Sequence, residues 1–155
     1  MPEPLLHPLH GVPLFGHLDG AQLALIEECA SDARFEPGEQ LFREGDAARS
    51  FFVIRTGTVA IEVFVPVRGA VRIETLSLGE ALGWSWLFPP YRRQFDARAL
   101  TGVHTTVFHA ECLRAKCDAD PVLGYELMRT FAQVLVERMQ WTHLRLLDVY
   151  GDSGR

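Results

Sequence analysis

The sequence lacks any apolar run long enough to cross a bilayer, since spanning needs about 20 consecutive apolar residues. It also lacks an excess of basic residues: 15 Lys and Arg against 20 Asp and Glu give a formal net charge of −5. That charge argues against broad binding to nucleic acid backbones or anionic lipid. The first residues have neither the basic start nor the apolar core of a signal peptide. We therefore expect a cytoplasmic chain with no membrane association.

Cysteine is scarce, with three residues at Cys29, Cys112 and Cys117. An odd number of cysteines, with no spacing pattern of a disulfide framework, is typical of proteins in a reducing compartment. Cys112 and Cys117 lie too far apart for a zinc knuckle, and no second pair completes a site. We expect all three cysteines to be small buried hydrophobes. Three N-terminal histidines have no carboxylate or thiol partner at ligand spacing, so no metal site is predicted there: His7, His10 and His17.

What is present fits one globular domain. The chain has 155 residues, of which 48% are hydrophobic and 23% charged, enough for a single core. Residues 1–12, rich in Pro and His, predict an irregular arm. Asp19 is a typical helix N-cap, and the side chain of Gln22 is placed to accept a hydrogen bond from the backbone N–H of Asp19. The apolar spacing that follows predicts a helix over 19–30.

Residues 32–109 predict a series of short antiparallel strands. Turn signals at 37–39, 45–46 and 56–57 separate apolar or alternating segments. The expected strands are 33–35, 40–43, 51–55, 58–65, 71–76, 95–101 and 104–109. Seven or eight strands at this spacing indicate an antiparallel barrel or jelly roll.

The final third returns to helical patterns. A short helix is expected at 111–117, and Asp120 followed by Pro121 marks the start of a long helix over 121–148. Gly151 is the expected C-cap, with 151–155 as a tail. The long helix has more apolar residues than one docked face needs, so we expect a second partner surface that includes Trp141, Leu144 and Leu147.

The segment 79–99, GEALGWSWLFPPYRRQFDARA, interrupts the strands. Gly79 and Gly83 allow backbone conformations closed to other residues, and 81–87 could form one or two helical turns. Unpaired N–H groups at the start of such a turn suit an anion, to which Arg92 or Arg93 would add a full charge. The alternative is a plain loop that closes the barrel, with its Trp residues inside and its Arg residues in water.

Four spaced segments carry a family resemblance: PLFGHLDGAQLALI, FEPGEQLFREGDAARSFFVIRTGTVAIEV, LSLGEALGW and RTFAQVLVERMQWTHLRLLDVYG. Over 13–150 they resemble the cyclic nucleotide-binding domain of the catabolite activator protein and Fnr regulators. The resemblance implies a mainly β fold, an antiparallel double-stranded β-helix (jelly roll) with flanking helices. It also implies a phosphate-binding cassette at 79–99 and a homodimer through the long C-terminal helix.

The cassette departs from the family at its ribose contact. Where the family has Gly-Glu, with the Glu accepting a hydrogen bond from the ribose 2′-hydroxyl, this chain has Gly83 followed by Trp84. Losing one such bond costs about 1.5–3 kcal/mol, on the order of ten- to a hundredfold in affinity. The family's phosphate-binding Arg falls at Arg93 in the kinase-type spacing and at Gln94 in the bacterial spacing. The candidate ligand-binding residues are Gly83, Trp84, Ser85, Trp86, Arg92, Arg93, Gln94 and Phe95.

Two functions follow from these patterns. The first is a stand-alone sensor that binds a small anion, either a cyclic nucleotide such as cAMP or cGMP or another anionic metabolite. The second is a protein-interaction or dimerisation module whose pocket is filled by Trp. An enzyme of the cupin type is not favoured, because His104 and His109 are five residues apart and point to opposite faces of a strand. No Ser-His-Asp arrangement is visible either.

We expect no direct DNA binding by this chain. In the related regulators a sequence like LLDVYG leads into a helix-turn-helix domain, whereas here only 151–155 follow and the net charge is acidic. A gel-shift titration against random and selected duplexes at physiological salt should show no specific complex. A sequence-selective footprint would contradict this prediction.

Overall fold

The computed structural model describes residue 9 and residues 11–153, and the chain divides into two compact units, Met1–Lys116 and Cys117–Arg155. Most of the expected N-terminal arm, residues 1–8 and 10, lies outside the described residues, as do the last two residues of the tail. His7 and His10 fall in that part of the chain. The first unit contains all the strands described below, and the second consists mainly of one long helix.

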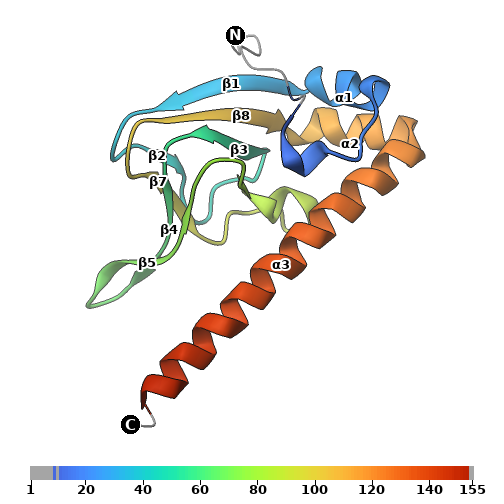
Figure 1. Ribbon diagram of the computed structural model, residues 1–155. Helices are drawn as coiled ribbons and strands as arrows, with labels where there is room; N and C mark the ends of the chain where they lie inside the picture. The colour runs from blue at the N-terminus through green and yellow to red at the C-terminus, as the bar shows by residue number, and fades with distance from the viewer. Residues whose placement is uncertain (1–8, 10, 154–155) are drawn as a thin grey trace. The chain divides into compact units, whose positions relative to one another are not determined.

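The first unit is built from two four-stranded antiparallel sheets (Figure 1). One sheet has the order β1-β8-β3-β6 and the other β2-β7-β4-β5. The strands are β1 (Ala30–Phe35), β2 (Gln40–Phe42), β3 (Ser50–Thr56), β4 (Val59–Val65), β5 (Gly69–Leu76), β6 (Ala81–Leu82), β7 (Asp96–Ala99) and β8 (Val103–His109). All pairings between these strands are antiparallel, which confirms the predicted jelly roll.

Strand β3 is buried on both of its faces. Phe52 and Ile54 belong to the core between the two sheets, together with residues of β4 to β8. Phe51 points to the other face, where its ring stacks on Phe108 with centroids 4.7 Å apart. Because successive strand residues face opposite sides, burial on both faces explains why β3 is a continuous apolar run and not an alternating one.

The helices begin where the sequence predicts. Asp19 caps α1 (Gly20–Glu27) through a capping box with Gln22, with bonds of 2.8 and 3.0 Å. The helix ends before residue 30 because Ala30 already pairs with β8. Helix α2 (Ala110–Ala119) follows β8 directly, and Asp120 caps α3 (Pro121–Ser153) by accepting from Leu123 N–H at 3.2 Å.

Helix α3 passes through Gly151, so the predicted C-cap at that residue is wrong. Glycine also adopts right-handed helical angles at a modest cost in entropy, so a single glycine marks a helix end only weakly. Within the part of the chain that the structure describes, no helix combines the length and the apolarity needed to cross a membrane.

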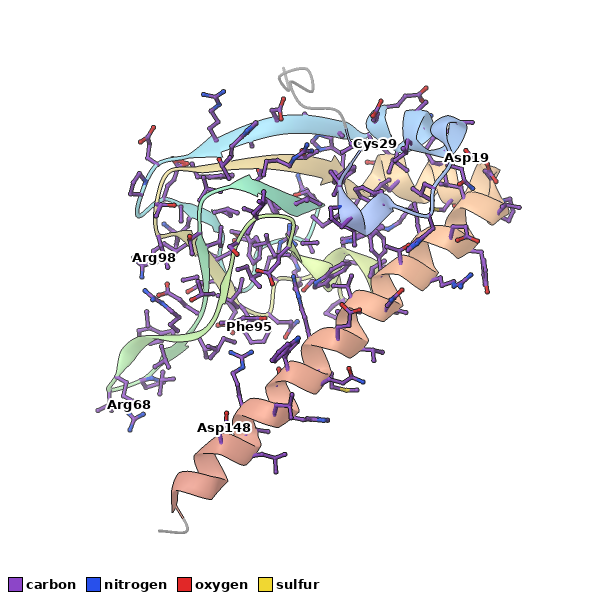
Figure 2. The ribbon with its side chains drawn as sticks, viewed as in Figure 1. Asp19, Cys29, Arg68, Phe95, Arg98 and Asp148 are labelled. Atoms are coloured by element: carbon purple, nitrogen blue, oxygen red, sulfur yellow. A yellow bond between two sulfur atoms is a disulfide. The ribbon has the colours of Figure 1, made fainter. Side chains whose placement is uncertain are left out.

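Two of the three cysteines differ from the expectation drawn from the sequence. Cys29 and Cys112 form a disulfide with their Cα atoms 5.5 Å apart, so the expectation of three unpaired cysteines is wrong. The two lie 83 residues apart in sequence, and spacing gives no signal for a long-range pair of this kind. Cys29 lies between α1 and β1 (Figure 2), and Cys117 remains a free, half-buried thiol. The cysteine count therefore no longer argues for a reducing compartment.

Candidate functional site

The cassette begins as a strand and continues as one short helical turn. Ala81 and Leu82 form β6 and pair with β3, so the predicted helical segment 81–87 is wrong over its first two residues. The 3-10 helix η2 (Trp84–Leu87) follows. Gly79 and Gly83 have φ angles of 83° and 93°, in the left-handed region as expected. A four-residue turn has only a small dipole, so an anion here would depend on side-chain charge.

The guanidinium of Arg93 lies against the start of this turn. Its Nη1 donates to the Gly83 carbonyl at 3.0 Å, and its Nη2 donates to the Ser50 carbonyl at 2.6 Å. Its Cζ lies 4.3 Å from the centroid of the Phe42 ring, a cation–π distance. The residue as a whole is only 4% exposed. Two of the predicted site residues, Gly83 and Arg93, are thus in direct contact.

This cation has few partners for a buried charge. Burial lowers the pKa of Arg93 to about 10, while the more distant Asp46 carboxylate acts in the opposite direction. Among the described residues, no carboxylate forms an ion pair with Arg93, and no acceptor bonds its buried Nε–H. Arg93 is therefore charged at neutral pH, and its donors are not saturated.

The two cassette tryptophans pack on a core ring. Trp84 and Trp86 both stack near-parallel on Phe51, with centroids at 6.1 and 5.6 Å. Trp86 is 1% exposed and is part of the core, whereas Trp84 and its neighbour Ser85 are half-buried. The structure thus gives the two predicted aromatic residues different surroundings.

The remaining predicted residues are on the surface. Arg92, Gln94 and Phe95 are all exposed, and the Gln94 side chain donates to the Arg92 carbonyl at 3.2 Å. Arg98, a further cation of the cassette, is held by Glu62 through two bonds of 2.9 and 2.7 Å. The Arg98 hydrogen bond lowers the pKa of Glu62. Within the cassette, Arg93 is therefore the buried cation without a carboxylate partner among the described residues.

Sequence reasoning missed Ser50 and Phe42, which position Arg93. Ser50 contributes mainly a backbone carbonyl, and any residue type has one, so no sequence signal could have identified it. Phe42 lies on β2, far from the cassette in sequence. An aromatic residue in a strand is more often a core residue than a cation partner, so its spacing also gave no signal.

The two histidines of β8 lie on opposite sides of the strand, as their spacing predicts. His104 is buried and bonds Asp32 at 2.9 Å, whereas His109 is exposed and lies 3.1 Å from the Ser31 hydroxyl. Over residue 9 and residues 11–153, no group of three or more His, Cys, Asp or Glu side chains gathers at metal-binding distance.

The structure thus has the fold class of an antiparallel jelly roll, with flanking helices and the cassette between β5 and β7. The family profile described as "Cyclic nucleotide-binding domain" matches residues 33–120, more than half of the chain. The chain belongs to this family, which confirms the resemblance drawn from its sequence.

Relatives show the same fold in different contexts. A Rhodopseudomonas palustris protein provisionally named as a potassium channel is 28% identical over 75% of this chain, which spans only 28% of that protein's length. A cyclic nucleotide-binding domain from Methylobacillus flagellatus superposes with a TM-score of 0.79 at 21% identity, covering 93% of this chain and 81% of that one. The Thermus thermophilus catabolite activator protein gives 0.68 at 21% identity, over 86% and 61%.

Two glycines test the contact between Arg93 and the cassette. An added Cβ at Gly83 would lie 2.7 Å from Arg93 Nη1, whereas one at Gly79 would meet nothing within 4 Å. Both have positive φ, so an alanine at either position adds about 1–2 kcal/mol of backbone strain. Gly83→Ala should also displace the guanidinium.

We expect Gly83→Ala to weaken anion binding by about tenfold or more, and Gly79→Ala to leave it within about twofold. Calorimetric titration of both variants with the same ligand measures the difference. Equal affinities for the two would show that Arg93 does not bind the ligand from the position described.

Proposed function

We propose that this chain is a regulatory sensor module that binds a small anionic ligand beside Arg93, a cyclic nucleotide in the first instance. The observation that carries this proposal is the buried Arg93 guanidinium, which has donors to spare and no carboxylate partner among the described residues. Membership of the cyclic nucleotide-binding domain family supports the ligand class. We further propose that the protein binds its ligand without catalysing a reaction and that it acts in the cytoplasm.

The energetics favour an incoming anion. Burial lowers the pKa of Arg93 to about 10, which corresponds to on the order of 3 kcal/mol of disfavoured charge. A phosphate oxygen within hydrogen-bond distance would relieve part of this cost, because a charge-assisted bond to Arg is among the stronger hydrogen bonds in proteins. The Gly83 and Ser50 carbonyls would then share the guanidinium with the ligand or release it.

The contact that this site lacks is the one with the ribose of a cyclic nucleotide. Trp84 stands where the family has the Glu that accepts from the 2′-hydroxyl, and its ring already stacks on Phe51. An indole N–H donates and cannot accept that bond. We therefore propose weak binding of cAMP and cGMP, with little discrimination for the 2′-hydroxyl.

Calorimetry and thermal shift against cAMP, cGMP, their 2′-deoxy forms and inorganic phosphate test the proposal. We expect dissociation constants about ten- to a hundredfold larger than those of a site that has the Glu. The ribose and 2′-deoxy ligands should have nearly equal dissociation constants. Tight cAMP binding with a strong 2′-hydroxyl preference would show that another group replaces the Glu. No binding of any anion would favour the interaction-module alternative.

Helix α3 supports a second proposal, a homodimer through that helix. Its C-terminal half exposes large apolar side chains over successive turns, each at least 47% exposed: Val136, Met139, Trp141, Leu144, Leu146 and Leu147. The helical spacing places Met139 on one apolar stripe with Leu127, Phe131 and Leu135, which we expect to be buried; at 52% exposed, Met139 belongs to the exposed set instead. Apolar surface on this scale is typical of an interface between helices.

Leu144→Glu combined with Leu147→Glu should shift the dimer toward monomer by about a hundredfold in dissociation constant, because two carboxylates would be buried at the interface. Analytical ultracentrifugation across a dilution series measures the shift. Val122→Glu combined with Tyr125→Glu is the matched control, since both are exposed apolar residues of the same helix outside its C-terminal half. A native chain that stays monomeric at tens of micromolar would contradict the dimer.

A further inference from the structure

Helix α2 is attached on one face to the segment that links α1 and β1. Cys112 forms the disulfide with Cys29, and Lys116 forms an ion pair with Glu28. Positions 112 and 116 are four residues apart and therefore share one face of a helix. Figure 1 shows α1 and α2 side by side at one end of the sheet that contains β1 and β8.

The opposite face of α2 contacts the cassette. Arg114, two residues from Cys112, donates from Nη2 to the Trp86 carbonyl at 2.6 Å. Its Cζ lies 4.7 Å from the Tyr91 ring centroid and 5.8 Å from that of Trp86. Trp86 belongs to η2 and Tyr91 to the loop that follows, so one side chain connects α2 to both ends of the segment 86–91.

We propose that the Cys29–Cys112 disulfide is a redox switch that controls the order of the cassette through Arg114. The disulfide fixes α2 laterally, and Arg114 transmits that position to η2 and Tyr91. The N-terminal end of α2 has its own anchor, the hydrogen bond of 2.9 Å from Ala110 N–H to the Arg49 carbonyl. Loss of the disulfide leaves this face of α2 attached to residues 28–29 by the partly exposed Lys116–Glu28 ion pair, a weak constraint, so α2 can pivot about residue 110.

The chemistry requires a thiol reductant, either a small dithiol or a protein dithiol. Cys112 is half-buried whereas Cys29 is 1% exposed, so the reductant's thiolate attacks Sγ of Cys112. The Cys29 thiolate leaves and takes up a proton, and a mixed disulfide forms on Cys112. The second thiolate of the reductant then displaces Cys112, which is protonated in turn. Two electrons pass to the protein, and the reductant ends as a disulfide.

The consequence for ligand binding rests on the proposed function, but the effect on the cassette does not. With the disulfide intact, Arg114 holds the Trp86 carbonyl and packs on Tyr91, which keeps the segment before Arg93 ordered. After reduction this support weakens, and the cassette samples open states more often. The oxidised protein is then the form with the ordered anion site.

Hydrogen exchange measured without ligand tests the switch directly. We expect amides of residues 84–91 to exchange about three- to tenfold faster after reduction with dithiothreitol, while amides of the exposed turn 66–68, which exchange by local opening, stay unchanged. Arg114→Ala in the oxidised form should show the same faster exchange, and reduction should then add no further change in 84–91. Cys117→Ser, which removes the free thiol and leaves the disulfide, is the control and should behave as the native chain.

Three results would overturn the switch: intact mass without the disulfide, equal exchange of 84–91 in both redox states, or a reduction effect that persists in Arg114→Ala. The oxidised Arg114→Ala measurement stands even if the reduced chain loses stability throughout. An exchange difference without any anion binding would reject the proposed ligand function and leave the switch in place. Anion binding with no exchange difference would reject the switch alone.

Discussion

Arg93→Ala should abolish measurable binding of anionic ligands, a loss of about a hundredfold or more in affinity. Arg93 is the buried cation of the cassette, and charge-assisted hydrogen bonds to such a group are worth about 1.5–3 kcal/mol each. Arg92→Ala is the matched control, because Arg92 is adjacent in sequence but exposed. It should change affinity by less than about threefold. Isothermal titration of both variants gives the comparison.

The same site predicts a pH dependence. Burial lowers the pKa of Arg93 to about 10, so the guanidinium is charged, and binding is constant, from neutral pH up to about 9. Above that range the free protein loses the charge, and affinity should fall as the pH rises through 10. A bound anion favours the charged form and moves the decline to higher pH. Affinity that falls between pH 6 and 8 instead would indicate that the ligand or a histidine titrates, and not Arg93.

Local signals in the sequence predicted most of the fold. The Asp19 and Gln22 capping box, the Asp120 cap and the turn glycines each depend on residues within a few positions, and each is present in the structure. The strand pattern over 32–109 was equally local. Its main error concerns Ala81 and Leu82, which pair with β3 although two residues are too few to show any periodicity.

Contacts between distant segments were beyond such reasoning. The disulfide joins residues that are 83 apart in sequence. The contacts of the Arg93 guanidinium join three separate segments: Phe42 of β2, Ser50 at the start of β3, and Gly83 of the cassette. The family resemblance points to Arg93 in the kinase-type spacing and to Gln94 in the bacterial one, and the structure shows Arg93 in contact with Gly83, whereas the Ser50 carbonyl has no side-chain signature. Arg114 was not predicted either, since its contacts with Trp86 and Tyr91 depend on how α2 follows β8.

Loss of the Cys29–Cys112 disulfide should lower the free energy of unfolding by about 3–4.5 kcal/mol. The bridge closes a loop with a sequence separation of 83, and removing such a constraint increases the entropy of the unfolded chain. Cys112→Ala is the suitable variant, because it leaves only a buried Cys29 thiol, which packs as a small hydrophobe. Urea unfolding at one protein concentration measures the change in midpoint.

A variant of the free cysteine, Cys117, is the control that distinguishes loss of the disulfide from a general effect of replacing a cysteine. Cys117→Ser should cost less than about 1 kcal/mol, because Cys117 has no disulfide partner. Reduction of the native chain should bring its midpoint to that of Cys112→Ala, and reduction of Cys112→Ala should change nothing further, since no disulfide remains to be cleaved. If the oxidised native chain and Cys112→Ala unfold at the same urea concentration, the bridge adds no stability. Residual structure in the unfolded chain or strain in the folded one would then offset the entropy of loop closure.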